Sequence, residues 1–172
     1  MITSINKEIK LNFFKISGWN YLKRKDEHIW YSGDKNFVFK IIDYLRSKNP
    51  NLNKIKKTLL AKNRNSSIVY QRKKLFFGCT DFARSYPIFF NETENTINIK
   101  NSCKDIKYKS SDINKDAMRQ AKLTGYCLNY NTLITNLKIM KPGEFFIANN
   151  KSVTYEKYFD YHKTFKPKIK NK

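Results

Sequence analysis

The chain has 172 residues, 40% of them hydrophobic, which suits one globular domain with a buried core rather than two independent domains. Lys and Arg number 35 against 14 Asp and Glu, a formal net charge of +21, and 13 Phe, 11 Tyr and 2 Trp are interleaved with them. The sequence has no window of roughly 18 consecutive apolar residues and no signal-peptide pattern at its N-terminus, which argues against membrane and secreted proteins. We therefore expect a cytoplasmic protein without a membrane partner.

Basic charge combined with aromatic residues predicts one possible function, the binding of single-stranded nucleic acid. Lys and Arg neutralise phosphates, and Phe and Tyr stack on bases. The charge is spread along the chain, however, whereas a binding groove concentrates it on one element. The basic runs lie at residues 23–25, 54–57, 72–74 and 163–172. Because Lys, Asn and Ile have A/T-rich codons, nucleotide bias and an ordinary solvated surface are the competing explanation.

Metal and cofactor chemistry have little support in the sequence. Three cysteines, Cys79, Cys103 and Cys127, form no C-x-x-C pair, and the only histidines are His28 and His162. Five glycines are too few and too scattered for a Gly-rich phosphate loop. We expect free thiols, no metal and no cofactor.

The first half of the chain predicts short strands followed by two helices. Residues 11–31 alternate apolar and polar side chains around Gly18, which indicates two or three strands. The Ser-Gly-Asp turn that ends at Asp34 can supply a helix N-cap, and a helical apolar stripe then runs until Pro50 stops it. The stripe consists of Phe37, Val38, Ile41, Ile42 and Leu45. A second short helix is expected from Leu52, Ile55, Leu59 and Leu60.

The second half predicts three hairpins and one helix. Residues 67–81 indicate two strands joined by a basic turn, and residues 87–100 indicate another hairpin. Asp112 can cap a helix that runs to about Lys122, with Gly125 as its C-terminal signal. The last hairpin, residues 144–159, turns at Asn149-Asn150.

This order of elements predicts an α+β domain built on mainly antiparallel sheet, because strands and helices do not alternate as in βαβ units. We assign residues 1–160 to this domain and expect residues 161–172 to form a basic, disordered tail.

Two clusters of charged residues do not predict catalysis. Neighbours in a strand point to opposite faces, so the Asp-Glu-His run at residues 26–28 cannot converge and is interpreted as a polar turn. Asp116 and Arg119 are three residues apart on the predicted helix, which favours a surface ion pair over a substrate clamp.

A more specific pattern begins with GCTDFARSYPIFFN at residues 78–91. Asp81 ends an apolar strand, Pro87 follows, and Ile-Phe-Phe opens the next strand. Further along, Thr132 begins a Thr-Leu segment that reaches Pro142-Gly143 just before the last hairpin. This arrangement resembles the class II glutamine amidotransferase domain at the N-terminus of asparagine synthetases. That family has a strand ending in Asp, an Asp-x-x-Gly-x-x-Pro turn, a Leu-Tyr-Tyr strand and a later Thr-Leu to Pro-Gly segment.

The resemblance covers roughly residues 32–160 and ends at Tyr158-Phe159, where the family often has Tyr-Trp before its synthetase domain. It implies an Ntn-hydrolase-like αββα sandwich, here shortened in its N-terminal part. Arg84 occupies the family's glycine position, and a positive φ there costs about 1 kcal/mol. Asp34 can stand in for the family's Asp that grips the glutamine amino group, although helix capping is the competing interpretation.

Departures from the family predict that the chain has no catalytic residues. The family's nucleophile is an N-terminal cysteine, whereas position 2 here is Ile2 and no cysteine precedes Cys79. Thr3 becomes an N-terminal nucleophile only if two residues are removed. The pyrophosphate loop of the synthetase site is absent as well. The resemblance therefore implies a non-catalytic amidotransferase-like domain that partners an ATP-dependent, amide-forming synthetase domain or subunit, and nucleic-acid binding is the alternative.

Overall fold

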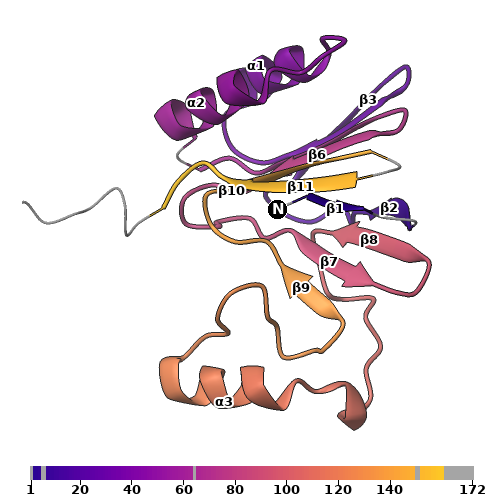
Figure 1. Cartoon of the computed structure of the whole chain (residues 1–172), viewed down its shortest axis with the longest axis vertical. Helices are drawn as coiled ribbons and strands as arrows, with labels where there is room; N and C mark the ends of the chain where they lie inside the picture. Colours follow the sequence, from indigo (N-terminus) through magenta and orange to yellow (C-terminus); the bar gives the residue numbers. More distant parts are fainter. Residues whose placement is uncertain (1, 5–6, 64, 150–151, 161–172) are drawn as a thin grey trace, which may run out of the picture.

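The computed structural model describes residues 2–4, 7–63, 65–149 and 152–160, and these residues form two β-sheets and three α-helices (Figure 1). The larger sheet contains β1 (Ile2–Ser4), β3 (Asn20–Arg24), β4 (Glu27–Tyr31), β5 (Ile68–Arg72), β6 (Leu75–Cys79), β10 (Glu144–Ala148) and β11 (Ser152–Lys157). The smaller sheet contains β2 (Glu8–Asn12), β7 (Phe89–Glu92), β8 (Thr96–Lys100) and β9 (Leu137–Ile139). The strand orders are β1-β11-β10-β6-β5-β4-β3 and β2-β8-β7-β9, and of the paired strands only β2 and β8 run parallel. The predicted α+β class with mainly antiparallel sheets is confirmed.

Helices α1 (Lys35–Leu45) and α2 (Leu52–Lys62) cover the outer face of the larger sheet (Figure 1). Asp34 caps α1, since its Oδ1 accepts hydrogen bonds from the backbone N–H groups of Asn36 (2.8 Å) and Phe37 (3.3 Å). Every residue of the predicted apolar stripe of α1 is buried. The stripe of α2 is narrower than predicted, because Ile55 and Leu59 are buried whereas Leu60 is 46% exposed.

The two sheets pack face to face through aromatic rings. Phe90 of β7 meets Phe146 of β10 edge-on, with ring centroids 5.5 Å apart, and also lies against Tyr155 of β11. Gly78 of β6 makes room for this contact, because a Cβ at that position would lie 2.2 Å from the Phe146 ring. A fully buried Phe stabilises the fold by roughly 1.5–3 kcal/mol, so this layer contributes much of the core energy.

Helix α3 (Lys115–Thr124) lies beyond the smaller sheet, on the side opposite α1 and α2 (Figure 1). Its predicted cap was wrong. Asn114 is the N-cap and accepts from the N–H of Ala117 (3.0 Å), while Asp112 closes a preceding 3₁₀ turn (Ser110–Asp112) by accepting from the N–H of Lys109. The C-terminal signal is confirmed, as Gly125 adopts φ 81°.

The predicted tail at residues 161–172, His162, and Asn150 of the predicted Asn149-Asn150 turn lie outside the described residues. Within the described part of the chain, no helix has the length and apolar character needed to cross a membrane.

Candidate functional site

Asp81 forms the buried centre of a corner between β6 and β7. Its Oδ1 accepts hydrogen bonds from the N–H groups of Ala83 (2.8 Å) and Ser85 (3.0 Å). Its carbonyl oxygen accepts from the N–H groups of Arg84 (3.3 Å) and Gly143 (2.9 Å). The side chain is fully buried. The carboxylate is therefore committed to the backbone of the turn and is not placed to act on a substrate.

Two residues of the corner adopt left-handed backbone conformations. Arg84 has φ 55°, which costs a non-glycine residue about 1–2 kcal/mol. Gly143 has φ 64°, and a Cβ there would lie 2.8 Å from Cβ of Phe159. Glycine is thus required at 143 by both conformation and space, whereas Arg84 holds strain in the turn that Pro87 ends.

The end of the described chain joins the same corner. The N–H groups of Tyr158 (2.9 Å) and Phe159 (3.1 Å) both donate to the carbonyl oxygen of Gly143. The Tyr158 hydroxyl donates to the carbonyl of Thr80, and the Phe159 ring stacks on Phe82 with centroids 4.1 Å apart. Three separate segments, residues 80–87, 142–143 and 158–159, therefore meet at one place. We call this meeting point the Asp81 corner.

Thr132, the other residue of the resemblance, lies outside this corner. Its hydroxyl donates to the carbonyl oxygen of Leu137 (2.8 Å), with the carbonyl oxygen of Ile134 also within reach (3.1 Å), and accepts from the N–H of Ile134 (3.1 Å). Thr132 thus shapes the turn that leads into β9, and Pro142-Gly143 carries the chain from there to the corner.

A hollow of about 290 Å³ opens beside the Asp81 corner. Arg84, Lys141, Lys157 and Asp160 supply its charged lining, and Tyr126, Leu128, Pro142 and Phe159 supply apolar walls. Lys157 pairs with Asp160 at 3.5 Å. Burial lowers the pKa of the half-buried Arg84 guanidinium, and no carboxylate of the described residues lies within ion-pair distance of it. The hollow therefore offers a cation between apolar walls.

The segment between β8 and β9, residues 101–136, exposes large apolar side chains next to this hollow. We call it the α3 arm. Within it Leu123 is 86% exposed and Tyr126 is 61% exposed, and Ala117 is the only buried residue of α3. Tyr108, Leu128 and Leu133 are exposed as well. We take these exposed apolar side chains, of which Tyr126 and Leu128 line the hollow, as a candidate contact surface for another molecule.

A buried carboxylate links the α3 arm to the larger sheet, and the sequence pattern did not reveal it. Glu144 opens β10, accepts from the Tyr130 hydroxyl and from the N–H of Lys141 (3.3 Å), and is almost wholly buried. Burial raises the pKa of Glu144, and burial next to this carboxylate also raises the pKa of Tyr130. Lys141 lies over the Tyr130 ring at 4.0 Å. This contact fixes the loop before β9 against β10.

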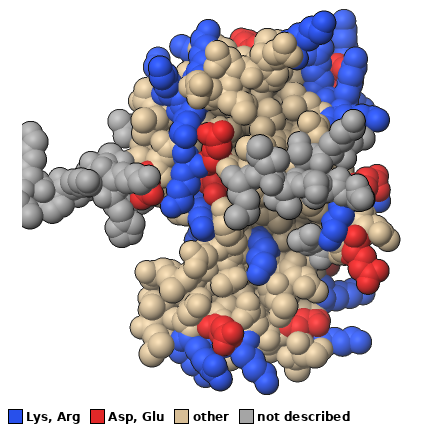
Figure 2. Space-filling view, in the orientation of Figure 1, with Lys and Arg blue, Asp and Glu red and all other residues tan. Residues whose placement is uncertain are grey.

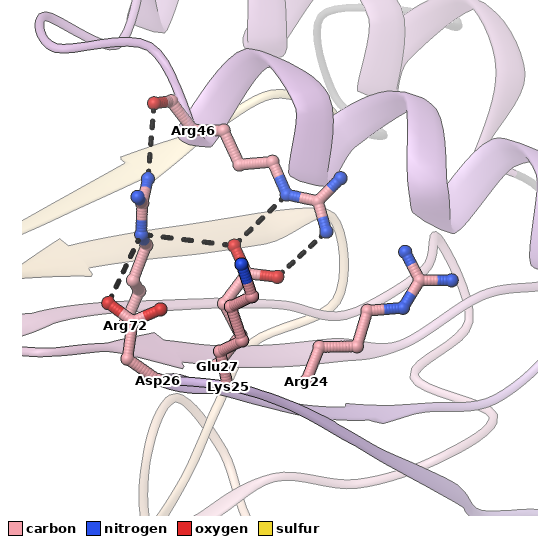
Figure 3. A pocket seen from close by; sticks show the side chains of 6 residues that line it. All are labelled: Arg24, Lys25, Asp26, Glu27, Arg46 and Arg72. Carbon is pink, nitrogen blue, oxygen red and sulfur yellow. Dashed lines mark hydrogen bonds and ion pairs between the residues drawn. The ribbon is translucent and has the colours of Figure 1, made fainter.

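At the opposite end of the larger sheet, Glu27 anchors a group of arginines (Figure 3). It is 6% exposed and accepts from Nε (3.0 Å) and Nη2 (2.7 Å) of Arg46 and from the Tyr70 hydroxyl (2.9 Å). The hydrogen bond from Arg46 is the main reason why the pKa of Glu27 lies below its usual value. The polar-turn interpretation was therefore wrong for Glu27, which opens β4. The expectation that the run does not converge holds for His28, which bonds the Tyr21 hydroxyl (2.8 Å) on the other face, but not for the two acids, since Asp26 and Glu27 lie 3.6 and 3.9 Å from Arg72 Nε.

Cys79 and Cys103 lie in surroundings that oppose ionisation of their thiols. Cys79 is fully buried in β6, and burial raises the pKa of its thiol, as it does for the half-buried Cys103. Among the described residues no group of His, Cys, Asp and Glu side chains is arranged to hold a metal ion. No protein-family model matches the chain, and no curated protein matches it.

Proposed function

We propose that the chain is a non-catalytic, class II glutamine amidotransferase-like domain that supports an ATP-dependent synthetase of the asparagine synthetase type. The observation that carries the proposal is the Asp81 corner. Three of the segments that resemble the family, far apart in the sequence, hydrogen-bond to one another there through Asp81, Gly143 and Tyr158. If each segment resembled the family by chance alone, we would not expect the three segments to contact one another in the fold.

The architecture and the acids of the chain agree with this proposal. Two face-to-face, mainly antiparallel sheets with helices outside are compatible with an Ntn-hydrolase-like sandwich. Asp81 is bound to its own turn and Glu144 to Tyr130 and Lys141. Asp34 uses one oxygen to cap α1. These acids stabilise the fold, and Cys79 is buried, so none of these side chains is placed to hydrolyse glutamine.

The α3 arm is the surface that we assign to the synthetase. Leu123 and Tyr126 provide the apolar contact, and the Arg84 guanidinium in the adjoining hollow provides a cation for an acidic side chain of the partner. In the described part of the isolated domain these apolar side chains are exposed and no carboxylate lies within ion-pair distance of Arg84. Association would bury the apolar side chains and place an acidic side chain of the partner next to Arg84.

Binding and glutaminase measurements test this assignment. The purified chain is mixed with an asparagine synthetase-type synthetase domain from the same source, and the dissociation constant is measured by biolayer interferometry. Leu123→Glu with Tyr126→Ala should weaken binding at least about 10-fold, because each replaces an exposed apolar anchor. Leu60→Glu is the matched control, since Leu60 is 46% exposed on α2 at the far side of the molecule.

The control should bind like the unchanged chain, and the purified domain should release no ammonia from glutamine. Ammonia release, or a complex that the arm variant leaves intact while Leu60→Glu weakens it, would refute the proposed role.

A further inference from the structure

The ends of two neighbouring hairpins place an excess of positive charge at one corner of the larger sheet. Glu27 of β4 pairs with Arg72 of β5, so the β3–β4 and β5–β6 turns lie side by side. Figure 2 shows Lys and Arg gathered at the upper right, where Figure 1 places these hairpin ends. The six cations of the two turns are Lys23, Arg24, Lys25, Arg72, Lys73 and Lys74. We call this surface the hairpin ridge.

The acids of the ridge are already occupied. Arg72 Nε lies 3.6 Å from Asp26 and 3.9 Å from Glu27, and Arg46 holds both oxygens of Glu27 (Figure 3). Arg24 takes part in none of the interactions drawn there, and its guanidinium lies 5.1 Å from the Phe39 ring centre. Among the described residues, no carboxylate pairs with Arg24 or with Lys25. The ridge therefore keeps cations in excess of the acids that could neutralise them.

The opposite face of the same hairpins adds a hollow of about 560 Å³. Lys73 and Lys74 line it together with Lys7, Glu8, Ile9, Gln71 and Phe76, and the one acid, Glu8, pairs with Lys10 at 3.1 Å. Register places Lys23, His28 and Gln71 in one row across β3, β4 and β5, leading from the edge strand into this hollow. A polyanion that crosses the ridge would thus meet lysines on both sides of the sheet.

An aromatic ring lies on the same face as this row. Tyr21 is 45% exposed, stacks on Trp30 with centroids 4.1 Å apart, and bonds His28 through its hydroxyl. Trp30 in turn stacks on Phe13. The Tyr21 ring is therefore held in one orientation before any ligand arrives, so a base that stacks on it has little side-chain entropy to overcome.

We propose that the hairpin ridge binds single-stranded nucleic acid, with backbone phosphates on Arg24, Lys25, Lys73 and Lys74 and a base stacked on Tyr21. This is a second function, independent of the amidotransferase resemblance and on a different part of the molecule from the α3 arm. An anionic membrane fits less well, because Tyr21 is the only large apolar side chain of the described hairpin residues that is exposed. A polyanion without bases, such as inorganic polyphosphate, has no group that could stack on the Tyr21 ring.

Fluorescence anisotropy with labelled oligo(U) and oligo(dT) of about 15 nucleotides tests the phosphate contacts. Binding should weaken steeply with salt, and Lys73→Glu with Lys74→Glu should weaken it at least about 10-fold and reduce the slope of log K against log salt by roughly 1.4. Lys54→Glu with Lys57→Glu, the same charge change on α2, should weaken binding less than about threefold. Equal losses in the two variants would overturn the assignment to the ridge, since net charge alone would then explain binding.

Tyr21→Ala tests the stacked base. Oligonucleotide binding should fall about 10-fold, whereas binding of inorganic polyphosphate should stay unchanged and Tyr21→Phe should bind like the unchanged chain. Thermal melts identify any variant that is unfolded. If Tyr21→Ala does not fold, Tyr21→Phe still tests the ring, because it keeps the aromatic contacts and removes only the hydroxyl. Polyphosphate or phosphatidylserine vesicles that bind as tightly as the oligonucleotides, or oligonucleotide binding that Tyr21→Ala leaves intact, would overturn the proposal.

Discussion

The two ends of strand β6 show opposite uses of charged residues. At its Cys79 end the chain enters the Asp81 corner, where a fully buried carboxylate accepts hydrogen bonds from the turn that follows it. At its Leu75 end the strand emerges from Lys73-Lys74, on a ridge where cations outnumber acids. A charged residue in a sequence motif is thus part of the architecture when the backbone satisfies it, and a candidate for ligand binding when it is left in excess and exposed.

A large effect should come from removing the acid of the corner. Asp81→Ala removes the buried carboxylate that accepts from the N–H groups of Ala83 and Ser85, and hydrogen bonds to a charged group are worth about 1.5–3 kcal/mol, so the free energy of unfolding should fall by about 2 kcal/mol in urea denaturation. Asp116→Ala is the control. Asp116 pairs with Arg119 on an exposed helix face, as the sequence predicted, and its loss should cost under about 0.5 kcal/mol. Similar losses in the two variants would remove the distinction between a structural acid and a surface acid.

Glu27 shows that the ridge end also contains a structural acid. Glu27→Gln should lower the free energy of unfolding by about 2 kcal/mol, because Arg46 loses its buried partner charge. Since the pKa of Glu27 is lowered in the folded state, its contribution is present above the unfolded value of 4.5 and is lost as pH falls through the folded value.

Denaturation at about pH 7 and about pH 3 measures this pH dependence. The loss of stability on acidification should be smaller in Glu27→Gln than in the unchanged chain. An identical acid dependence in both proteins would contradict the assigned role of the Arg46 pair.

The smallest effect is expected at Arg84, where the corner holds strain. Arg84→Gly should raise the free energy of unfolding by about 0.5 kcal/mol, because relief at φ 55° outweighs the greater freedom of glycine in the unfolded chain. Gly143→Ala should do the reverse, since Gly143 has φ 64° and Phe159 leaves no room for a Cβ. Chemical denaturation measures both. Stabilisation by Gly143→Ala would contradict the claim that residue 143 has a positive φ and no space for a Cβ.

The sequence predicted local structure better than it predicted sites. The apolar stripe of α1 and the hairpins followed from periodicity, since helix and strand patterns depend on near neighbours. Both Asp112 and Asn114 are capping residue types, and the choice between them depends on the 3₁₀ turn that Asp112 closes.

The sequence pattern could not predict which residues contact the buried charges. Arg46 and Tyr70 reach Glu27 from 19 and 43 residues away, and such pairs depend on how α1 packs against the sheet. Leu123 is exposed because α3 lies beyond the smaller sheet and buries only Ala117, and this placement depends on the tertiary fold. No pattern indicated the buried contact between Glu144 and Tyr130, because Tyr130 reaches Glu144 from 14 residues away.

The proposed support of a synthetase is tested most directly by hydrogen–deuterium exchange of the chain, alone and with the asparagine synthetase-type synthetase domain. We predict slower exchange in the α3 arm between residues 117 and 129 when the synthetase is present, and unchanged exchange at the hairpin ridge. Unchanged exchange throughout the α3 arm at saturating synthetase would contradict the account.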